Sequence, residues 1–303
     1  MSATPNPPTL DPPAVARWQT SAPHVAPWLH EEVARRMLER LQWIKLQPQA
    51  WAHWGAVRGG PEAHAKLLQI YPDSESFIAE TQSGRDKAAL NLIATDWWRP
   101  SRWIGPRSQI GLPGPVTLDM LWANMALHEV TQPLALMAQW HTALKVGGFV
   151  MFSCLGPDTA RELRSLYASL GWPPAGHDLT DMHDWGDLLV QAGFAEPVMD
   201  MERIVLTFET PERLLAELAG LGRNFHPKRF AGLRGRGWKS QLLQSLEGLR
   251  SGSHGDRLPL TFEIIYGHAL KAAPKVKVSG QSVVSEQDLR SMLKATRVTR
   301  VTR

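Results

Sequence analysis

The amino-acid sequence predicts an α/β fold built on a doubly wound, mostly parallel sheet. Residues 117–123 and 149–154 are short apolar runs, and residues 133–145 between them have apolar positions at helical spacing. A parallel pair of strands requires a connection of about that length. Strands that are apolar on both faces suit a sheet covered by helices on each side. In such a sheet, ligands bind at the carboxyl ends of the strands, which here are residues 124–128 and 155–159.

A glycine-rich turn follows the first predicted strand. Residues 50–54 are apolar and lead into Gly-Ala-Val-Arg-Gly-Gly at 55–60, after which Pro61 opens a helix. Glycine allows a nucleotide-like ligand to approach the backbone closely. Glu80 ends the next predicted strand, 76–79, about 20 residues further on, the spacing at which an acid can hold both hydroxyls of a ribose. A generic βαβ unit that binds no nucleotide fits the same residues.

We expect a third strand at residues 90–95, with Asp96 at its end, where a carboxylate would reach a base amino group. Residues 97–116 are rich in Pro and Gly and predict a long loop over the pocket. Strands are also predicted at 198–208 and 258–270. The stretch between these two strands, about 211–257, has helical spacing and predicts a lid over the carboxyl ends of the sheet.

The two ends of the chain differ from its middle. Residues 1–13 contain five prolines and lack apolar periodicity, so we expect a disordered leader. Residues 29–46 have the pattern of an amphipathic helix, with acids first and arginines later, which would pack across the sheet edge or over the site. From 274 to 303 the chain is polar and basic, which predicts a disordered tail. A single domain at 14–273 is left between them.

Composition excludes several classes of protein. The chain has 303 residues, of which 43% are hydrophobic and 20% charged, which rules out wholesale disorder. No apolar run approaches the ~18 residues of a membrane span, and we expect a cytoplasmic protein without a signal peptide. Cys154 is the only cysteine, so an intrachain disulfide and a Cys-based metal cluster are excluded, and no metal site is predicted.

Basic residues gather within the predicted lid. The net charge is +4, and the clustered cations are Arg223, Lys228, Arg229, Arg234, Arg236 and Lys239. Clustered positive charge attracts an acidic partner, and the weak interleaving of aromatic residues favours an acidic protein over nucleic acid. The alternative is a solvated basic face without a partner.

Three stretches of the second half resemble a known family. They are LKVGGFVMFSCLGPDTARELRSLY, DMHDWGDLLVQAGFAEPVMDMERIVLTF and LPLTFEIIYGHALKA. Together they resemble the class I S-adenosylmethionine-dependent methyltransferases, and most closely the BioC family, the malonyl-ACP O-methyltransferases of biotin synthesis. The resemblance runs from about 29 to 272 and is most specific after 119. It implies a Rossmann-like, seven-stranded, mostly parallel sheet whose last strand is antiparallel, and S-adenosylmethionine as the cofactor.

The first half departs from the family pattern at the glycine turn. The family motif is similar to hydrophobic-Asp-hydrophobic-Gly-x-Gly-x-Gly, whereas His53 stands in place of the acid and Val57 in place of the middle glycine. A β-branched residue avoids positive φ, so either the loop is rebuilt or the ligand sits further out. Gly55, Gly59 and Glu80 match the pattern, and the resemblance implies that they hold the cofactor.

The resemblance also implies the reaction. Asn124 matches the family position beside the sulfonium that carries the methyl group. A malonyl carboxylate is ionised at neutral pH, so it can attack this methyl directly, and the site has only to align the two and exclude water. Arg223 or Lys228 would contact the carboxylate. His128 and His183 are either polar members of the pocket or structural histidines.

Two functions remain open at this point. The first is methylation of the free carboxylate of malonyl-ACP or malonyl-CoA in biotin synthesis. The acyl carrier protein would dock on the basic residues of the lid, Arg223, Lys228, Arg234 and Arg236. The second is a catalytically degenerate methyltransferase-fold protein that acts as a binding or assembly factor. His53 and Val57 favour the second.

Overall fold

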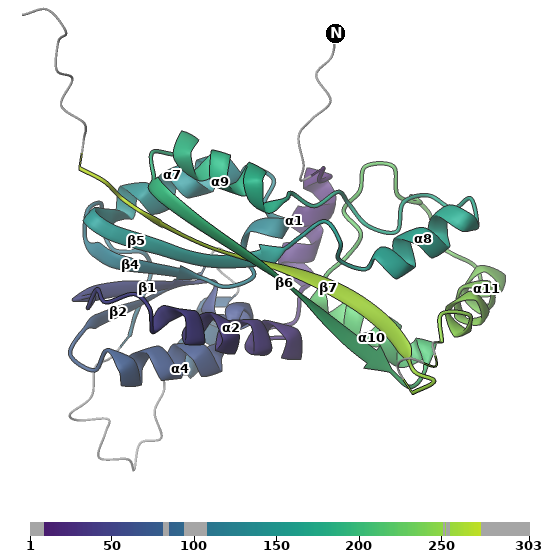
Figure 1. Ribbon diagram of the computed structural model, residues 1–303. Coiled ribbons are helices and arrows are strands. Elements are labelled where there is room, and N and C mark those ends of the chain that lie inside the picture. The colour runs from purple at the N-terminus through teal and green to yellow at the C-terminus, as the bar shows by residue number, and fades with distance from the viewer. Residues whose placement is uncertain (1–8, 81–84, 94–107, 251, 253–254, 274–303) are drawn as a thin grey trace, which may run out of the picture. The chain divides into compact units, whose positions relative to one another are not determined.

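Seven strands form one sheet in the computed structural model, which describes residues 9–80, 85–93, 108–250, 252 and 255–273 (Figure 1). The strands are β1 Ala50–Trp54, β2 Glu75–Ala79, β3 Gln109–Ile110, β4 Leu118–Ala123, β5 Leu144–Leu155, β6 Ala195–Phe208 and β7 Leu258–Leu270. Their order in the sheet is β3-β2-β1-β4-β5-β7-β6. All are parallel except β7, which is antiparallel to both β5 and β6. The predicted seven-stranded sheet with an antiparallel last strand is confirmed.

Helices cover both faces of this sheet. They are α1 Pro12–Ser21, α2 Trp28–Leu41, α3 Ala56–Gly59, α4 Pro61–Ile70, α5 Asp86–Ile93, α7 Pro133–Ala143, α8 Arg161–Ser169, α9 Met182–Gln191, α10 Pro211–Leu221 and α11 Arg236–Glu247, with a 3-10 turn η2 at Leu127–Glu129. Apolar side chains of α2 and α4 pack on one face with Trp51. Those of α7 and α9 pack with Ala52 on the other face, and Figure 1 shows these two helices together on one side of the sheet. Because neighbouring strand residues point to opposite faces, this alternation produces the doubly wound core.

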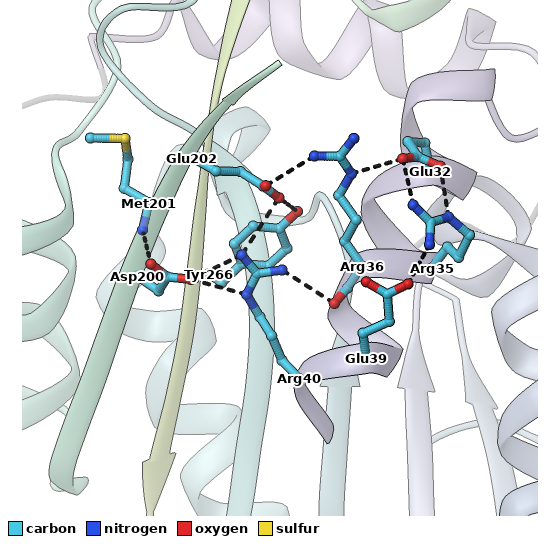
Figure 2. A network of polar contacts seen from close by, with 9 residues as sticks. All are labelled: Glu32, Arg35, Arg36, Glu39, Arg40, Asp200, Met201, Glu202 and Tyr266. Atoms are coloured by element: carbon cyan, nitrogen blue, oxygen red, sulfur yellow. Dashed lines mark hydrogen bonds and ion pairs between the residues drawn. The ribbon is translucent and has the colours of Figure 1, made fainter. Parts of the chain in front are cut away.

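Charged contacts fix α2 to the antiparallel edge of the sheet. Arg36 pairs with Glu32 at 2.7 Å on its own helix and with Glu202 of β6 at 2.9 Å. Arg40 pairs with Asp200 of β6 at 2.9 Å and lies 3.8 Å from the ring centre of Tyr266. We call these contacts the α2–β6 network (Figure 2). The predicted amphipathic helix is therefore confirmed, although it ends at Leu41 and not at residue 46.

The long strands β6 and β7 carry the insertion that was predicted as a lid. They pair from Ala195 with Leu270 to Phe208 with Leu258. Helices α10 and α11 connect them, and α8 lies beside α11 and β7 (Figure 1). Both helices lie within residues 211–257, where helical spacing was predicted. The insertion therefore projects from the carboxyl end of β6, where ligands bind in such sheets.

The prediction of a third strand at residues 90–95 is wrong. The segment forms α5, which ends at Ile93, and the third strand is β3, within the stretch that was predicted as a loop. Ala88, Ala89 and Leu92 pack on Val57 and Ile78. These three residues are one, three and four positions apart, which places them on one face of a helix and not on one face of a strand. A short apolar run fits either element by periodicity alone, so the sequence did not distinguish them. Asp96 lies outside the described residues.

The boundaries of the domain differ slightly from the sequence prediction. Helix α1 begins at Pro12, inside the segment predicted as a leader, and Asp11 pairs with Arg229 at 2.6 Å. The compact unit that contains the sheet ends at Ala272. Residues 1–8 and 274–303, where the leader and tail were predicted, lie outside the described residues. No helix in the described part of the chain is both long enough and apolar enough to cross a membrane.

Candidate active site

The turn after β1 is helical. Gly55 has φ +68° and donates its backbone N–H to Ala79 O at 2.8 Å. Residues 56–59 then form α3, and Gly60, with φ +117°, separates it from α4. Only glycine takes these left-handed conformations without strain. A Cβ built on Gly55 would meet no atom within 4 Å, so this part of the turn faces open space.

Val57 is built into the core by this helical turn. Its φ is not positive, its side chain is 3% exposed, and it packs against Ile78 and Ala89. Of the two alternatives that the sequence left open, the loop is the one that has been rebuilt. The backbone N–H of Val57 donates to Glu80 Oε1 at 2.9 Å. The Glu80 carboxylate therefore lies beside the turn at the end of β2, where the spacing predicted it.

His53 lies beneath the turn in place of the family's acid. It is fully buried in β1, 5.5 Å from the ring of His64, and burial lowers the pKa of its imidazole well below 6.5. A Cβ on Gly59 would come within 3.2 Å of both His53 Nε2 and Asn124 O. A neutral ring thus fills the space under the turn, and Gly59 is required there by close packing.

Asn124 holds the turn to its neighbours. Its Nδ2 donates to Gly59 O at 2.5 Å and to His30 O at 2.8 Å. Its Oδ1 accepts from Ser153 Oγ at 2.6 Å. Both amide hydrogens are therefore used within the protein, and Asn124 connects β4 to the turn, to α2 and to β5.

Gly55, Gly59 and Asn124 line one pocket at the carboxyl end of the sheet. Its volume is about 310 Å³, and we call it the glycine pocket. The size is at the lower end of the range for small-molecule sites. Arg58 and Arg85 also line it, and the sequence did not indicate either. Arg58 donates to the backbone oxygens of Gly220 and Leu221 at 3.0 and 3.1 Å, so it binds the carboxyl end of α10.

A second pocket of about 340 Å³ lies between the sheet, α8 and the lid. Most of its lining is carbon, from residues such as Leu163, Leu218 and Phe225, and we call it the apolar pocket. It shares His30 and Glu129 with the glycine pocket, so the two pockets adjoin. These two side chains form the wall that the pockets have in common.

The two shared residues have shifted pKa values. Trp18 Nε1 donates to Glu129 Oε1 at 3.0 Å, and removal from water raises the pKa of Glu129 to about 7. His30 donates its Nδ1 hydrogen to Arg58 O at 2.8 Å, and burial lowers its pKa to about 4. The imidazole of His30 is therefore neutral, and Nε2 carries its lone pair. The sequence indicated neither residue, although Glu129 directly follows the predicted ligand-binding segment 124–128.

The predicted docking residues do not behave as one group. Arg223 lines the apolar pocket, where it donates to Gly222 O at 2.8 Å and lies 4.5 Å from the Trp18 ring centre. Arg234 lies 4.0 Å from the Phe230 ring centre. Lys228 and Arg236 are exposed. The predicted basic surface is thus divided into cations held on aromatic rings and cations open to solvent.

The two histidines that were predicted as either pocket members or structural residues differ in their environment. His128 is buried and lines the apolar pocket. His183 is exposed in the first turn of α9.

Comparison with known proteins decides the family. The chain is 36% identical to the malonyl-[acyl-carrier protein] O-methyltransferase of Gallionella capsiferriformans, over 84% of this chain and 88% of that protein. It is 41% identical to the protein of the same name from Laribacter hongkongensis, over 82% of this chain and 84% of that protein. The chain belongs to this family. No family model matches it.

Solved structures agree on the fold. A Bacillus halodurans protein assigned as a methyltransferase superposes with a TM-score of 0.51 at 11% identity, over 80% of this chain and 100% of that chain. The YcgJ protein of Bacillus subtilis gives a TM-score of 0.51 as well, over 79% and 99% of the two chains. Membership of the malonyl-[acyl-carrier protein] O-methyltransferase family therefore agrees with the resemblance seen in the sequence.

The methyl donor of this family of enzymes is S-adenosylmethionine, and the glycine pocket fits it. The open space at Gly55 leaves room for a ligand against the backbone. The Glu80 carboxylate lies beside the turn, although Glu80 is not among the residues that line the pocket. The departures at His53 and Val57 change what supports the turn from below, and both side chains are buried away from its open side.

Proposed function

We propose that this chain transfers a methyl group from S-adenosylmethionine to the free carboxylate of a malonyl thioester on acyl carrier protein. The observation that carries the proposal is the 36% and 41% identity, over more than four fifths of the chain, to proteins named for this activity. The adjoining pockets support it, because the reaction needs two ligands that meet at one point.

In this proposal the glycine pocket holds the methyl donor. When bound, S-adenosylmethionine supplies an electrophilic methyl group on a positively charged sulfur. Gly55 allows close approach to the backbone, and the Glu80 carboxylate accepts hydrogen bonds from the ribose hydroxyls. Asn124 holds the turn in place through Gly59 O.

The apolar pocket holds the acceptor. One oxygen of the malonyl carboxylate forms a bond to the methyl carbon while the carbon–sulfur bond breaks and its electron pair returns to sulfur. An anion and a cation thereby become a neutral ester and a neutral thioether, and no proton moves. The two opposite charges are partly neutralised in the transition state. A carbon-lined pocket stabilises the charged reactants poorly, so it lowers the barrier relative to water.

The acyl carrier protein would reach the pocket across the lid. Lys228 and Arg236 are exposed on it, and clustered positive charge raises the rate of encounter with an acidic protein in a manner that salt screens. Arg223 lines the pocket mouth on the same insertion.

The test is methyl transfer from radiolabelled S-adenosylmethionine to malonyl-ACP, with acetyl-ACP as the matched control. We expect a labelled ester from malonyl-ACP and none from acetyl-ACP, which has no free carboxylate. Equal labelling of both, or of neither, would overturn the proposal.

The second candidate is a binding or assembly factor that has lost methyl transfer. The observation in its favour is His53, which removes the negative charge that the family places under the glycine turn. A flat calorimetric titration of the folded protein with S-adenosylmethionine would establish this candidate over the first.

A further inference from the structure

The apolar pocket contains the positive charge of Arg164, which has no ion pair with any of the described residues. Arg164 lies on α8, next to Leu163, and both side chains line this pocket. Its Nη2 donates to His177 O at 3.0 Å, and the guanidinium has no other hydrogen bond among the described residues. A guanidinium has five N–H donors in a planar fork that matches a carboxylate.

The neighbouring carboxylates are committed elsewhere. Asp158 pairs with Arg203 at 2.7 Å, and Glu162 accepts from Thr261 N at 3.0 Å. Asp178 accepts from Thr9 Oγ1 at 3.0 Å. Among the described residues, none of these acids comes within ion-pair distance of Arg164. Burial lowers the pKa of Arg164, and the more distant charges of Asp178 and Asp158 offset this only in part.

Arg223, the other arginine of this pocket, is used differently. It is exposed, donates to two backbone oxygens at the end of α10, and rests on the Trp18 ring. Its charge is therefore solvated and its donors are partly occupied. Arg223 or Lys228 was predicted from the sequence as the contact for the acceptor carboxylate. In the structure, Arg164 lines the pocket from a partly buried position.

We propose that Arg164 binds the free carboxylate of the acceptor and thereby selects a malonyl over an acetyl thioester. This assignment rests on the proposed function. A carboxylate that enters a pocket lined mostly by carbon loses its hydration, which is unfavourable unless a cation replaces it. The fork of Arg164 meets that requirement, and because each carboxylate oxygen has two lone pairs, one stays available for the methyl group.

The same contact accounts for release of the product. Methylation turns the carboxylate into a neutral ester, and the charge-assisted hydrogen bond to Arg164 is replaced by a weaker neutral one. Arg164 therefore holds the substrate more tightly than the product.

The test compares wild type with Arg164→Gln, Arg164→Lys and the control Arg161→Gln in the full-length protein. Arg161 lies on the same helix, and its side chain is 56% exposed and makes only long ion pairs at 3.5 and 3.8 Å. Calorimetry measures the affinity for malonyl-CoA and for acetyl-CoA, both in the presence of S-adenosylhomocysteine. Thermal unfolding of each variant checks that the fold is retained.

We expect wild type to bind malonyl-CoA roughly tenfold or more tightly than acetyl-CoA, and Arg164→Gln to lose this preference. Arg164→Lys should restore part of it, because the charge is kept and the planar fork is lost. Arg161→Gln should behave as wild type. A purely structural role for Arg164 would weaken both ligands alike. An unchanged preference in Arg164→Gln, or no preference in wild type, would overturn the assignment.

Methyl-transfer kinetics separate this assignment from the proposed function. If wild type methylates malonyl-CoA and Arg164→Gln does so with the same KM, the function stands and the role of Arg164 fails. If wild type transfers no methyl group yet shows a preference for malonyl-CoA that depends on Arg164, the role of Arg164 stands and the function fails.

Discussion

Charged side chains serve different ends in the α2–β6 network and around the two pockets. In the network, Arg36 and Arg40 meet carboxylates at 2.9 Å, and Tyr266 donates to Glu202 at 2.5 Å (Figure 2). At the pockets, Arg164 has no carboxylate within ion-pair distance among the described residues, and Glu129 holds its proton up to a pKa of about 7. The charges of the network form ion pairs that hold α2 to β6. The charged and titratable groups of the pocket walls are instead partly buried in ways that lower the stability of the fold. Perturbed groups of this kind are typical of functional sites.

The largest predicted effect is a loss of stability at low pH, caused by the buried neutral histidines near the pockets. Burial lowers the pKa values of His30 and His177 to about 4, and that of His64, near the turn, to about 4 as well. The unfolded chain takes up protons near pH 6.5 and the folded protein does not. Stability is therefore fully present above pH 6.5 and is lost as the pH falls through 4, by up to about 3 kcal/mol for each histidine. Denaturant titrations at pH 7.5 and 5 measure this loss.

The exposed His183 provides the control for this prediction. His183→Gln should leave the difference between the two pH values unchanged, whereas His64→Gln should reduce it. Equal stability of wild type at pH 7.5 and 5 would contradict the neutral burial of these rings.

Glu129 should act in the opposite direction. Its folded-state pKa of about 7 is above the ordinary value of 4.5, so its contribution to stability is present below pH 4.5 and is lost as the pH rises through 7. Glu129→Gln should therefore stabilise the protein at pH 8 by about 2 kcal/mol more than at pH 4.5, allowing for the open pockets beside the carboxyl group. Thermal unfolding at both pH values tests this, and a pH-independent effect of the substitution would contradict it.

The next prediction concerns Glu80, whose carboxylate lies beside the glycine turn. Glu80→Ala should lower the affinity for S-adenosylmethionine roughly tenfold or more, because charge-assisted hydrogen bonds to the ribose are lost. Calorimetry with S-adenosylmethionine measures the change. Glu39→Ala, on the exposed side of α2, is the control and should bind as wild type does. Unaltered binding by Glu80→Ala would remove Glu80 from the cofactor site.

The smallest effect should come from the α2–β6 network itself. Arg36→Ala removes ion pairs to Glu32 and Glu202 in which the side chains are 16–28% exposed, and should cost about 1 kcal/mol of stability. Arg35→Ala, at a side chain that is 55% exposed, should cost less than about 0.5 kcal/mol. Neither should alter the KM for malonyl-CoA. Denaturant titration and methyl-transfer kinetics of both variants test whether the network affects stability alone. A raised KM in Arg36→Ala would contradict this.

The sequence was sufficient for features that depend on local pattern. Apolar runs and helical spacing predicted β4, α7 and β5, and the gap between the glycines and Glu80 predicted a carboxylate beside the turn. Periodicity and spacing report such features because each depends on residues that are close in the chain. The resemblance of the second half to the family was also readable, since its motifs are contiguous stretches.

Only the tertiary structure decided which side chains face the pockets. His30 of α2 and Glu129 of η2 line the same two pockets, and Asn124 holds α2 and the glycine turn together. Asp158 pairs with Arg203 of β6, and Arg164 has no ion pair within the described part of the chain. Such pairings join residues that are tens of positions apart, and no local pattern encodes them. Packing also decided that 86–93 is a helix, because its apolar residues find Val57 and Ile78 only once the sheet has formed.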